Sequence, residues 1–280
     1  MTTLSVEDQE ALERAYLLLE SPSFAAKVTN LIGTPVEKAL AVLPDNWSEK
    51  LMTSTKGALS RALDVAVATL NYQHAGEASN TAHKVFTSIS GALGGAFGLG
   101  GLAVELPIST TIMLRSIADI ARSEGENILD VETKLSCLEV FALGGPTQND
   151  DGSETGYFAV RTALGAAVTE AAKYITERGM AETGAPGLVR LVTQIATRYS
   201  IQVSEKAAAQ AIPIIGAAGG ATINLLFINH FQDIARGHFT VRRLERTYGT
   251  EQIKTAYEAL RDPNHRETPN QTESQAKTSG

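Results

Sequence analysis

The sequence contains a single cysteine and no excess of basic residues, and both features narrow the class of protein. Among 280 residues Cys137 is the only thiol, which excludes an internal disulfide and a zinc site built from several cysteines. The formal net charge is −7, whereas a protein that binds nucleic acid generally carries a basic surface. We therefore expect a cytoplasmic protein without a nucleic-acid partner.

Sequence signals of export and of common catalytic sites are also missing. The first residues include Glu7 and Asp8, where a secretory signal would have bases followed by an apolar run. No Gly-x-Ser-x-Gly, His-Glu-x-x-His or Gly-Lys-Ser/Thr motif occurs. The sequence indicates no cofactor and no catalytic residue, so an enzyme is the less favoured interpretation.

Apolar residues recur at helical spacing through most of the chain, and no segment shows the alternation of a strand. We therefore predict an all-α fold, a multi-helix bundle. The predicted helices cover 7–20, 35–43 with Pro35 at its first position, a segment from a cap at Asp45 or Asn46 to Leu70, 108–123, 130–143, 159–176, 188–210, 212–248 as one helix or a broken pair, and 253–260.

Two long stretches, 85–104 and 207–232, contain no Asp, Glu, Lys or Arg. Each is followed by the tetrapeptide Asp-Ile-Ala-Arg, at 119–122 and at 233–236. Apolar runs of this length belong in a core, against a partner or in lipid. The shared tetrapeptide suggests that the two regions are related, although an accidental match is an equal alternative.

Both stretches are rich in glycine and alanine. Gly91 and Gly95 are four residues apart, as are Gly216 and Gly220, so a helix would place each pair on one flank. Another backbone could approach closely there. We predict two central Gly/Ala-rich apolar helices or helical hairpins, which are either buried or inserted conditionally into lipid, with a loop around 98–101.

The segment 147–153 is polar, acidic and rich in residues that form turns. It predicts an acidic loop that joins the halves 1–146 and 154–261 of one helical domain. Residues 262–280 contain too little apolar surface to offset the entropy of folding, which predicts a disordered tail.

Several short signatures together resemble the EcsC family. They are Ser90-Gly91-Ala92-Leu93-Gly94-Gly95, Glu105-Leu106-Pro107, the run 115–121 and Ile212-Pro213-Ile214-Ile215-Gly216-Ala217. The resemblance extends from the first helix to about Tyr248. It implies a bacterial, helical protein that can associate with a membrane. Since the family has no established activity, it supplies no catalytic residues.

Basic residues follow the second uncharged stretch, at Arg236, Arg242, Arg243 and Arg246, with only Glu245 opposing them. Cations directly after an apolar segment suit the anionic lipid of a cytoplasmic membrane face. Together with the resemblance, they predict a membrane-associated accessory or interaction protein, peripheral at the inner face of the cell membrane. Its partner would be the membrane surface or a membrane protein. A soluble helical scaffold, or an oligomer, is the alternative.

Glu105 lies between two apolar runs, where an unpaired carboxylate would be costly to desolvate. We expect it to have a partner, a raised pKa or access to water, or else to start a helix. Asp119 and Asp233 each precede an arginine by three residues, the spacing of an ion pair within a helix. In a second interpretation these three acids converge with His230 as a metal site, and the protein is a metal-dependent hydrolase.

Overall fold

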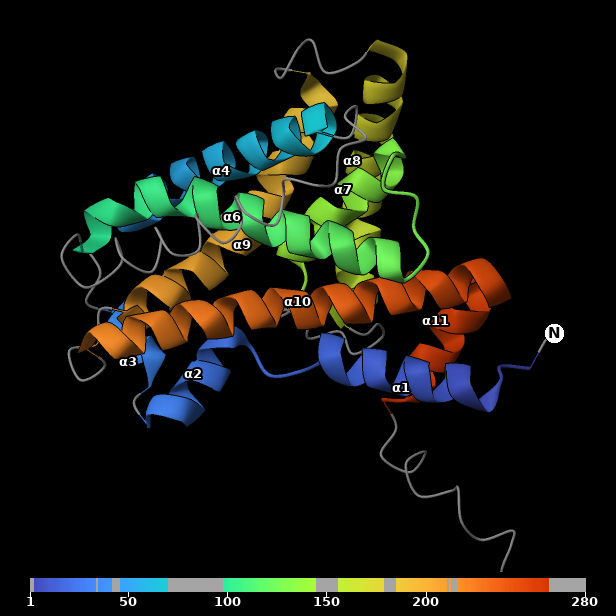
Figure 1. Ribbon diagram of the computed structural model, residues 1–280, viewed down its shortest axis with the longest axis horizontal. Helices are drawn as coiled ribbons and strands as arrows, with labels where there is room; N and C mark the ends of the chain where they lie inside the picture. The colour runs from blue at the N-terminus through green and yellow to red at the C-terminus, as the bar shows by residue number, and fades with distance from the viewer. Residues whose placement is uncertain are drawn as a thin grey trace, which may run out of the picture.

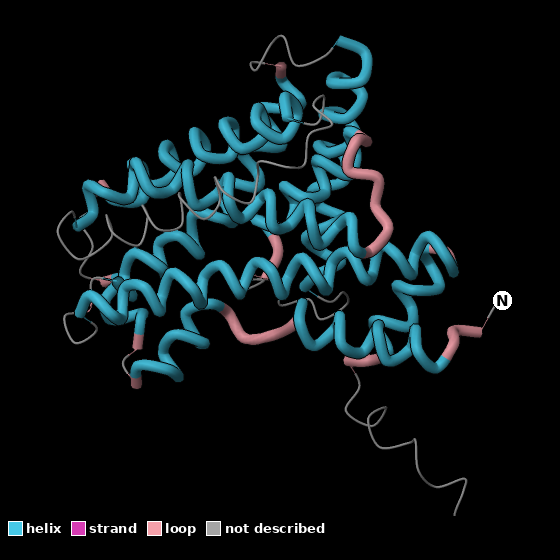
Figure 2. Tube along the Cα trace, in the orientation of Figure 1, coloured by secondary structure: helices cyan, strands magenta, loops and turns pink. Residues whose placement is uncertain are grey.

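The computed structural model describes residues 3–33, 35–41, 46–69, 98–144, 156–178, 185–210, 212 and 216–261. Over these ranges it contains helices and connecting turns but no strand, which confirms the predicted all-α bundle (Figures 1 and 2). The helices are α1 (Val6–Leu19), α2 (Phe24–Ile32), α3 (Val36–Leu40), α4 (Trp47–Thr69), α6 (Gly98–Ser123), α7 (Val131–Glu139), the 3-10 turn η1 (Val140–Ala142), α8 (Gly156–Arg178), α9 (Pro186–Gln210), α10 (Gly216–Tyr248) and α11 (Thr250–Ala259).

Helix α2 was not anticipated by apolar periodicity, because its nine residues are too few to show a clear repeat. Its ends nevertheless carry ordinary capping residues. The Ser23 hydroxyl accepts a hydrogen bond from the backbone N–H of Ala26, and Gly33 ends the helix with a φ of 66°. The capping residues Ser23 and Gly33 therefore define the two ends of α2.

Helix α6 begins at Gly98 and continues through Pro107, so the predicted loop around 98–101 and the predicted start at Ile108 are wrong. A proline inside a helix removes one backbone hydrogen bond and typically costs about 3 kcal/mol. Packing offsets this loss, because α6 contacts α4 on one side and α10 on the other. The Thr111 hydroxyl also donates to the carbonyl oxygen of Pro107, at 2.8 Å.

Helices α6 and α10 lie side by side and parallel, as Figure 1 shows in green and orange. The Gln232 amide donates to the Ser116 hydroxyl at 2.8 Å, and further along both helices Arg242 bonds Glu126 just after α6. Both pairs are 116 residues apart in sequence. The two Asp-Ile-Ala-Arg segments therefore lie at nearly the same level of the bundle.

Helix α9 runs antiparallel to α6 and completes the centre. Tyr199 shares a hydrogen bond of 3.1 Å with Thr110, and its ring lies 4.9 Å from Phe141 in η1 and 5.5 Å from Phe231 in α10, measured between centroids. Phe227 and Phe231 meet edge to face at 5.0 Å. Such aromatic contacts stabilise a core beyond the area they bury, and they fix α9 against α10.

Helix α10 approaches α1 closely at Gly237. A Cβ atom on Gly237 would stand 2.7 Å from Leu19 Cγ and 3.0 Å from the carbonyl oxygen of Ala15. Of the glycines predicted to pack helices, Gly216 and Gly220 lie in the first turns of α10, whereas Gly91 and Gly95 lie outside the described residues. Close packing at those four positions stays a prediction.

Helices from the first and second halves of the chain pack against each other, as α4 does on α9 and α1 on α10. The predicted acidic loop 147–153 and the predicted tail 262–280 lie outside the described residues. The predicted helix 130–143 is divided into α7 and η1. For 212–248 we predicted one helix or a broken pair, and the described part from Gly216 to Tyr248 is the single helix α10.

Candidate functional site

A buried ion pair links the two central helices α6 and α9. Lys206 Nζ lies 2.5 Å from Glu105 Oε1, and the two side chains are 1% and 5% exposed. The ammonium group also lies 4.9 Å from the centroid of the Phe227 ring, a favourable cation–π geometry. Burial lowers the pKa of Lys206, and Glu105 acts in the opposite direction.

This pair explains how the fold accommodates a carboxylate between two apolar runs. The predicted partner of Glu105 exists, while the alternative of a helix-start acid is wrong, because Glu105 lies in the interior of α6. Sequence reasoning missed Lys206. The available signal was its position, since it is the last charged residue before the uncharged stretch 207–232, as Glu105 is the first after 85–104.

Three helices approach one end of the bundle without any exposed charged side chain (the left end in Figure 1). They contribute residues 98–114 of α6, 199–210 of α9 and 216–232 of α10, which we call the uncharged end. The charged residues within these stretches, all buried, are Glu105, Glu205 and Lys206. The parallel course of α6 and α10 brings the starts of both helices to this end.

The uncharged end exposes large apolar side chains on each of its three helices. Ile108 of α6 is 40% exposed, Ile201 of α9 is 47% exposed and Leu225 of α10 is 51% exposed. Single exposed apolar residues are ordinary on protein surfaces. Here they lie on stretches of α6, α9 and α10 that have no exposed charged side chain, so these stretches offer no ionised group for water to solvate.

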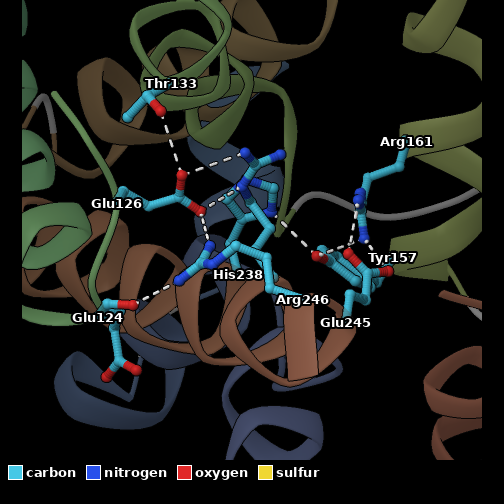
Figure 3. A network of polar contacts seen from close by, with 9 residues as sticks. Glu124, Glu126, Thr133, Tyr157, Arg161, His238, Glu245 and Arg246 are labelled. Atoms are coloured by element: carbon cyan, nitrogen blue, oxygen red, sulfur yellow. Dashed lines mark hydrogen bonds and ion pairs between the residues drawn. The ribbon is translucent and has the colours of Figure 1, made fainter. Parts of the chain in front are cut away.

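The opposite end of α10 is rich in ion pairs, shown in Figure 3. Glu126, between α6 and α7, accepts from Arg242 Nε at 2.8 Å and pairs with Arg246, while its second oxygen accepts from the Thr133 hydroxyl at 3.1 Å. Burial alone would raise the pKa of Glu126, but the bonds from Arg242 and Arg246 outweigh it and hold the pKa below its usual value.

A second set of bonds at this end attaches α1. Arg243 lies 3.0 Å from both Asp8 and Glu124, and the Tyr248 hydroxyl donates to Asp8 at 2.8 Å. Hydrogen bonds from Tyr248 and then Arg243 lower the pKa of Asp8. The predicted lipid-contacting arginines Arg242, Arg243 and Arg246 therefore make intramolecular ion pairs, and the fourth, Arg236, pairs with Asp233 at 2.8 Å.

Next to these arginines is a buried polar group that sequence reasoning did not assemble. Tyr157 shares a 2.9 Å hydrogen bond with His238 Nδ1, and Arg161 contacts both Tyr157 and Glu245 (Figure 3). Burial, followed by Arg161 and Arg242, holds the pKa of His238 well below its usual value, so the ring is neutral. Tyr157 and Glu245 come from helices α8 and α10, and only folding places them together.

Glu139 of α7 is a buried carboxyl group of this region, 6% exposed. Burial raises its pKa to about 7, against the opposing influence of Arg161 and Arg242. Both arginines are engaged by other carboxylates, Glu245 and Glu126. Glu139 therefore titrates near neutral pH inside the fold.

The four residues of the alternative metal site have separate partners. Glu105 pairs with Lys206, and His230 Nδ1 accepts from Lys27 Nζ at 3.3 Å, while Asp119 and Asp233 form exposed pairs with the arginines three residues on. Burial, followed by Lys27, lowers the pKa of His230 to about 3. In the described part of the chain, no group of three or more His, Cys, Asp or Glu side chains is arranged to hold a metal ion.

Membrane-spanning capacity is a separate question. Searched over the described residues, no helix combines the length and the apolar character needed to cross a bilayer.

The fold and these two ends define a helical bundle in which α6, α9 and α10 expose no charged side chain at one end, while α10 makes several ion pairs at the other. The sequence matches the EcsC protein family over residues 18–244, so the chain belongs to the EcsC family. No match was found among the curated proteins, and none among the solved structures. The matched region covers α2 to α9 and most of α10, whereas most of α1 and all of α11 lie beyond it.

Proposed function

We propose that this EcsC protein is a membrane-associated accessory or interaction protein that contacts the surface of a bilayer with its uncharged end. The observation that carries the proposal is the parallel course of α6 and α10, which gathers both uncharged helix starts at one end. Ile108, Ile201 and Leu225 would enter the boundary between headgroups and acyl chains, as in other proteins that lie on a membrane without spanning it.

The expected binding is weak and reversible. Moving a half-exposed Leu or Ile side chain from water into an apolar environment contributes about 1 kcal/mol. Three such residues give a contact that other interactions can strengthen or release. Such a protein would be peripheral at the inner face of the cell membrane.

A contact through Arg236, Arg242, Arg243 and Arg246 is the alternative suggested by their order in the sequence. Three of these arginines already bind Asp8, Glu124 or Glu126. A lipid phosphate would have to compete with those carboxylates. The uncharged end has no such competition, and for this reason it is the favoured contact.

Flotation of the purified chain with phospholipid vesicles tests the proposal. Leu225→Glu and Ile108→Glu should each weaken binding by about tenfold or more, because a carboxylate at a membrane contact must be desolvated. Leu17→Glu is the matched control, because Leu17 is 58% exposed, similar to Leu225, but lies away from the uncharged end. It belongs to α1, which packs against α10 near Gly237.

Unchanged binding by both variants would refute a contact at the uncharged end. If quadruple replacement of the arginines by Gln abolished binding instead, the alternative contact would be correct. A wild-type chain that binds no vesicles, and remains entirely in the soluble fraction of native cells, would favour the soluble scaffold.

A further inference from the structure

We infer that the uncharged end selects anionic phospholipid, through a belt of three cations, Lys27, Arg115 and Arg198, that would contact headgroup phosphates. This inference rests on the proposed membrane contact and specifies its lipid. It concerns residues that the sequence did not single out as lipid contacts.

Arg115 and Arg198 are the first charges met when leaving the uncharged end along α6 and α9, whereas α10 reaches the acid Asp233 first. Lys27 lies on the neighbouring α2. After the buried Glu105, the next charged residue of α6 is the exposed Arg115. Arg198 directly precedes the 199–210 stretch of α9, and Lys27 is the only charged residue of α2. Three separate helices therefore place a cation at the same boundary.

Contacts to α10 show that the three cations lie at a similar level along the length of the bundle. Lys27 Nζ donates to His230, and Ser116, next to Arg115, accepts from Gln232. Tyr199, next to Arg198, has its ring 5.5 Å from that of Phe231. All three cations thus lie near residues 230–232 of α10, at the inner limit of the uncharged end.

None of the three takes part in an ion pair within the described part of the chain. Burial lowers the pKa of Lys27, with Asp233 opposing it, and burial lowers the pKa of Arg198. A half-buried cation without a carboxylate partner gains from an anionic ligand, because the ligand compensates the lost hydration.

Nearby acids do not cancel this charge. Asp233 lies at the same level of α10, but it is paired with Arg236 at 2.8 Å. The neighbouring α3 contains one acid and one base, Glu37 and Lys38. The buried Glu205 of α9 accepts from the backbone N–H of Ala25 at 3.1 Å and offsets one of the three cations. Within the described residues the boundary therefore keeps a net positive charge, although the whole chain carries −7. Cations beside an apolar contact favour anionic lipid.

The test compares vesicles of phosphatidylcholine with vesicles that also contain phosphatidylglycerol. We expect the wild-type chain to bind the anionic vesicles about tenfold more tightly or better, and this preference to diminish as salt is added. The triple variant Lys27→Gln, Arg115→Gln, Arg198→Gln should bind both kinds of vesicle equally. The control variant Lys56→Gln, Arg61→Gln, Arg178→Gln removes the same formal charge elsewhere and should keep the preference.

Equal wild-type binding to both vesicles would overturn the inference while leaving the membrane contact intact. An equal loss in the control variant would also overturn it, since the effect would then follow net charge. Loss of binding to both vesicles in Leu225→Glu, with the lipid preference unchanged in the triple variant, would support the contact and refute the belt. If replacement of Arg198 unfolds the chain, the single variant Arg115→Gln tests the inference instead, because Arg115 is exposed. It should reduce the preference for anionic vesicles roughly fivefold.

Discussion

The two ends of α10 use charge in opposite ways. At the uncharged end the ion pair of Glu105 with Lys206 is buried and lies between helices. At the other end, pairs such as Asp8 with Arg243 and Glu126 with Arg246 are numerous and partly exposed. An exposed pair contributes little to stability because water solvates both partners, whereas a buried pair must remain intact. The comparison teaches that the number of ion pairs is a poor guide to which end holds the fold.

The largest expected effect comes from breaking the buried pair. Lys206→Met leaves the Glu105 carboxylate buried without a partner, which should lower the free energy of unfolding by about 3–5 kcal/mol. Urea unfolding monitored by circular dichroism measures this. The double variant Glu105→Gln, Lys206→Met should recover most of the loss, because no charge is then buried. A small loss in the single variant would mean that water reaches Glu105.

Glu139 offers a pH-dependent probe of the ion-paired end. Its pKa rises from 4.5 to about 7 on folding, so the folded chain holds the proton more tightly and stability from this group is lost as pH rises from 4.5 to 7. Glu139→Gln should therefore raise the free energy of unfolding at pH 8 by up to about 3 kcal/mol, with little gain near pH 4.5.

Urea midpoints across this pH range check the prediction. His230, whose pKa falls to about 3, acts in the opposite sense and removes stability as pH drops below 6.5. Together, Glu139 and His230 should give the wild-type chain a broad maximum in the free energy of unfolding as a function of pH. In Glu139→Gln this maximum should lie at higher pH. Glu13→Gln, at an exposed position on α1, is the control and should change neither contribution, because Glu13 does not act on Glu139 or His230. An unchanged profile in Glu139→Gln would show that the carboxylate is hydrated.

The smallest effect is expected at the exposed contacts of α1. Asp8→Asn removes the pair with Arg243 and should cost about 1 kcal/mol or less. Because folding lowers the pKa of Asp8, this contribution is present near neutral pH and lost as pH falls through the acid range. High salt should reproduce much of the effect. A loss as large as that of Lys206→Met would remove the proposed distinction between the two ends.

The helical fold could be predicted because its signals are local. Apolar periodicity locates α1, α4 and α9 within a few residues, and Asp130 stands at the N-terminal cap of α7 as its position suggested. The course of α6 through Pro107 could not be predicted, because packing against α4 and α10 outweighs a local helix breaker. Local rules fail where tertiary contacts decide.

Two ion pairs within a helix, Asp119 with Arg122 and Asp233 with Arg236, were predicted from their spacing and are confirmed. The ion pairs between helices depend on contacts between distant parts of the sequence, and sequence reasoning found only half of each. Glu105 was recognised as a carboxylate in need of a partner, but Lys206 is 101 residues away. Arg242 and Arg243 were recognised as a basic cluster, whereas Glu126 and Asp8, 116 and 235 residues away, determine what the cluster binds. A single sequence shows which charged residues are present, whereas the fold determines which of them form pairs.

The parallel pairing of α6 and α10 has a consequence during synthesis. Contacts 116 residues apart cannot form until α10 has left the ribosome, and at about 5–20 residues per second this interval lasts roughly 6–25 s. Throughout that interval α6 is already made and lacks its partner helix. The nascent chain therefore needs protection from aggregation, by a chaperone or by an early association with lipid, before its own last long helix can cover it.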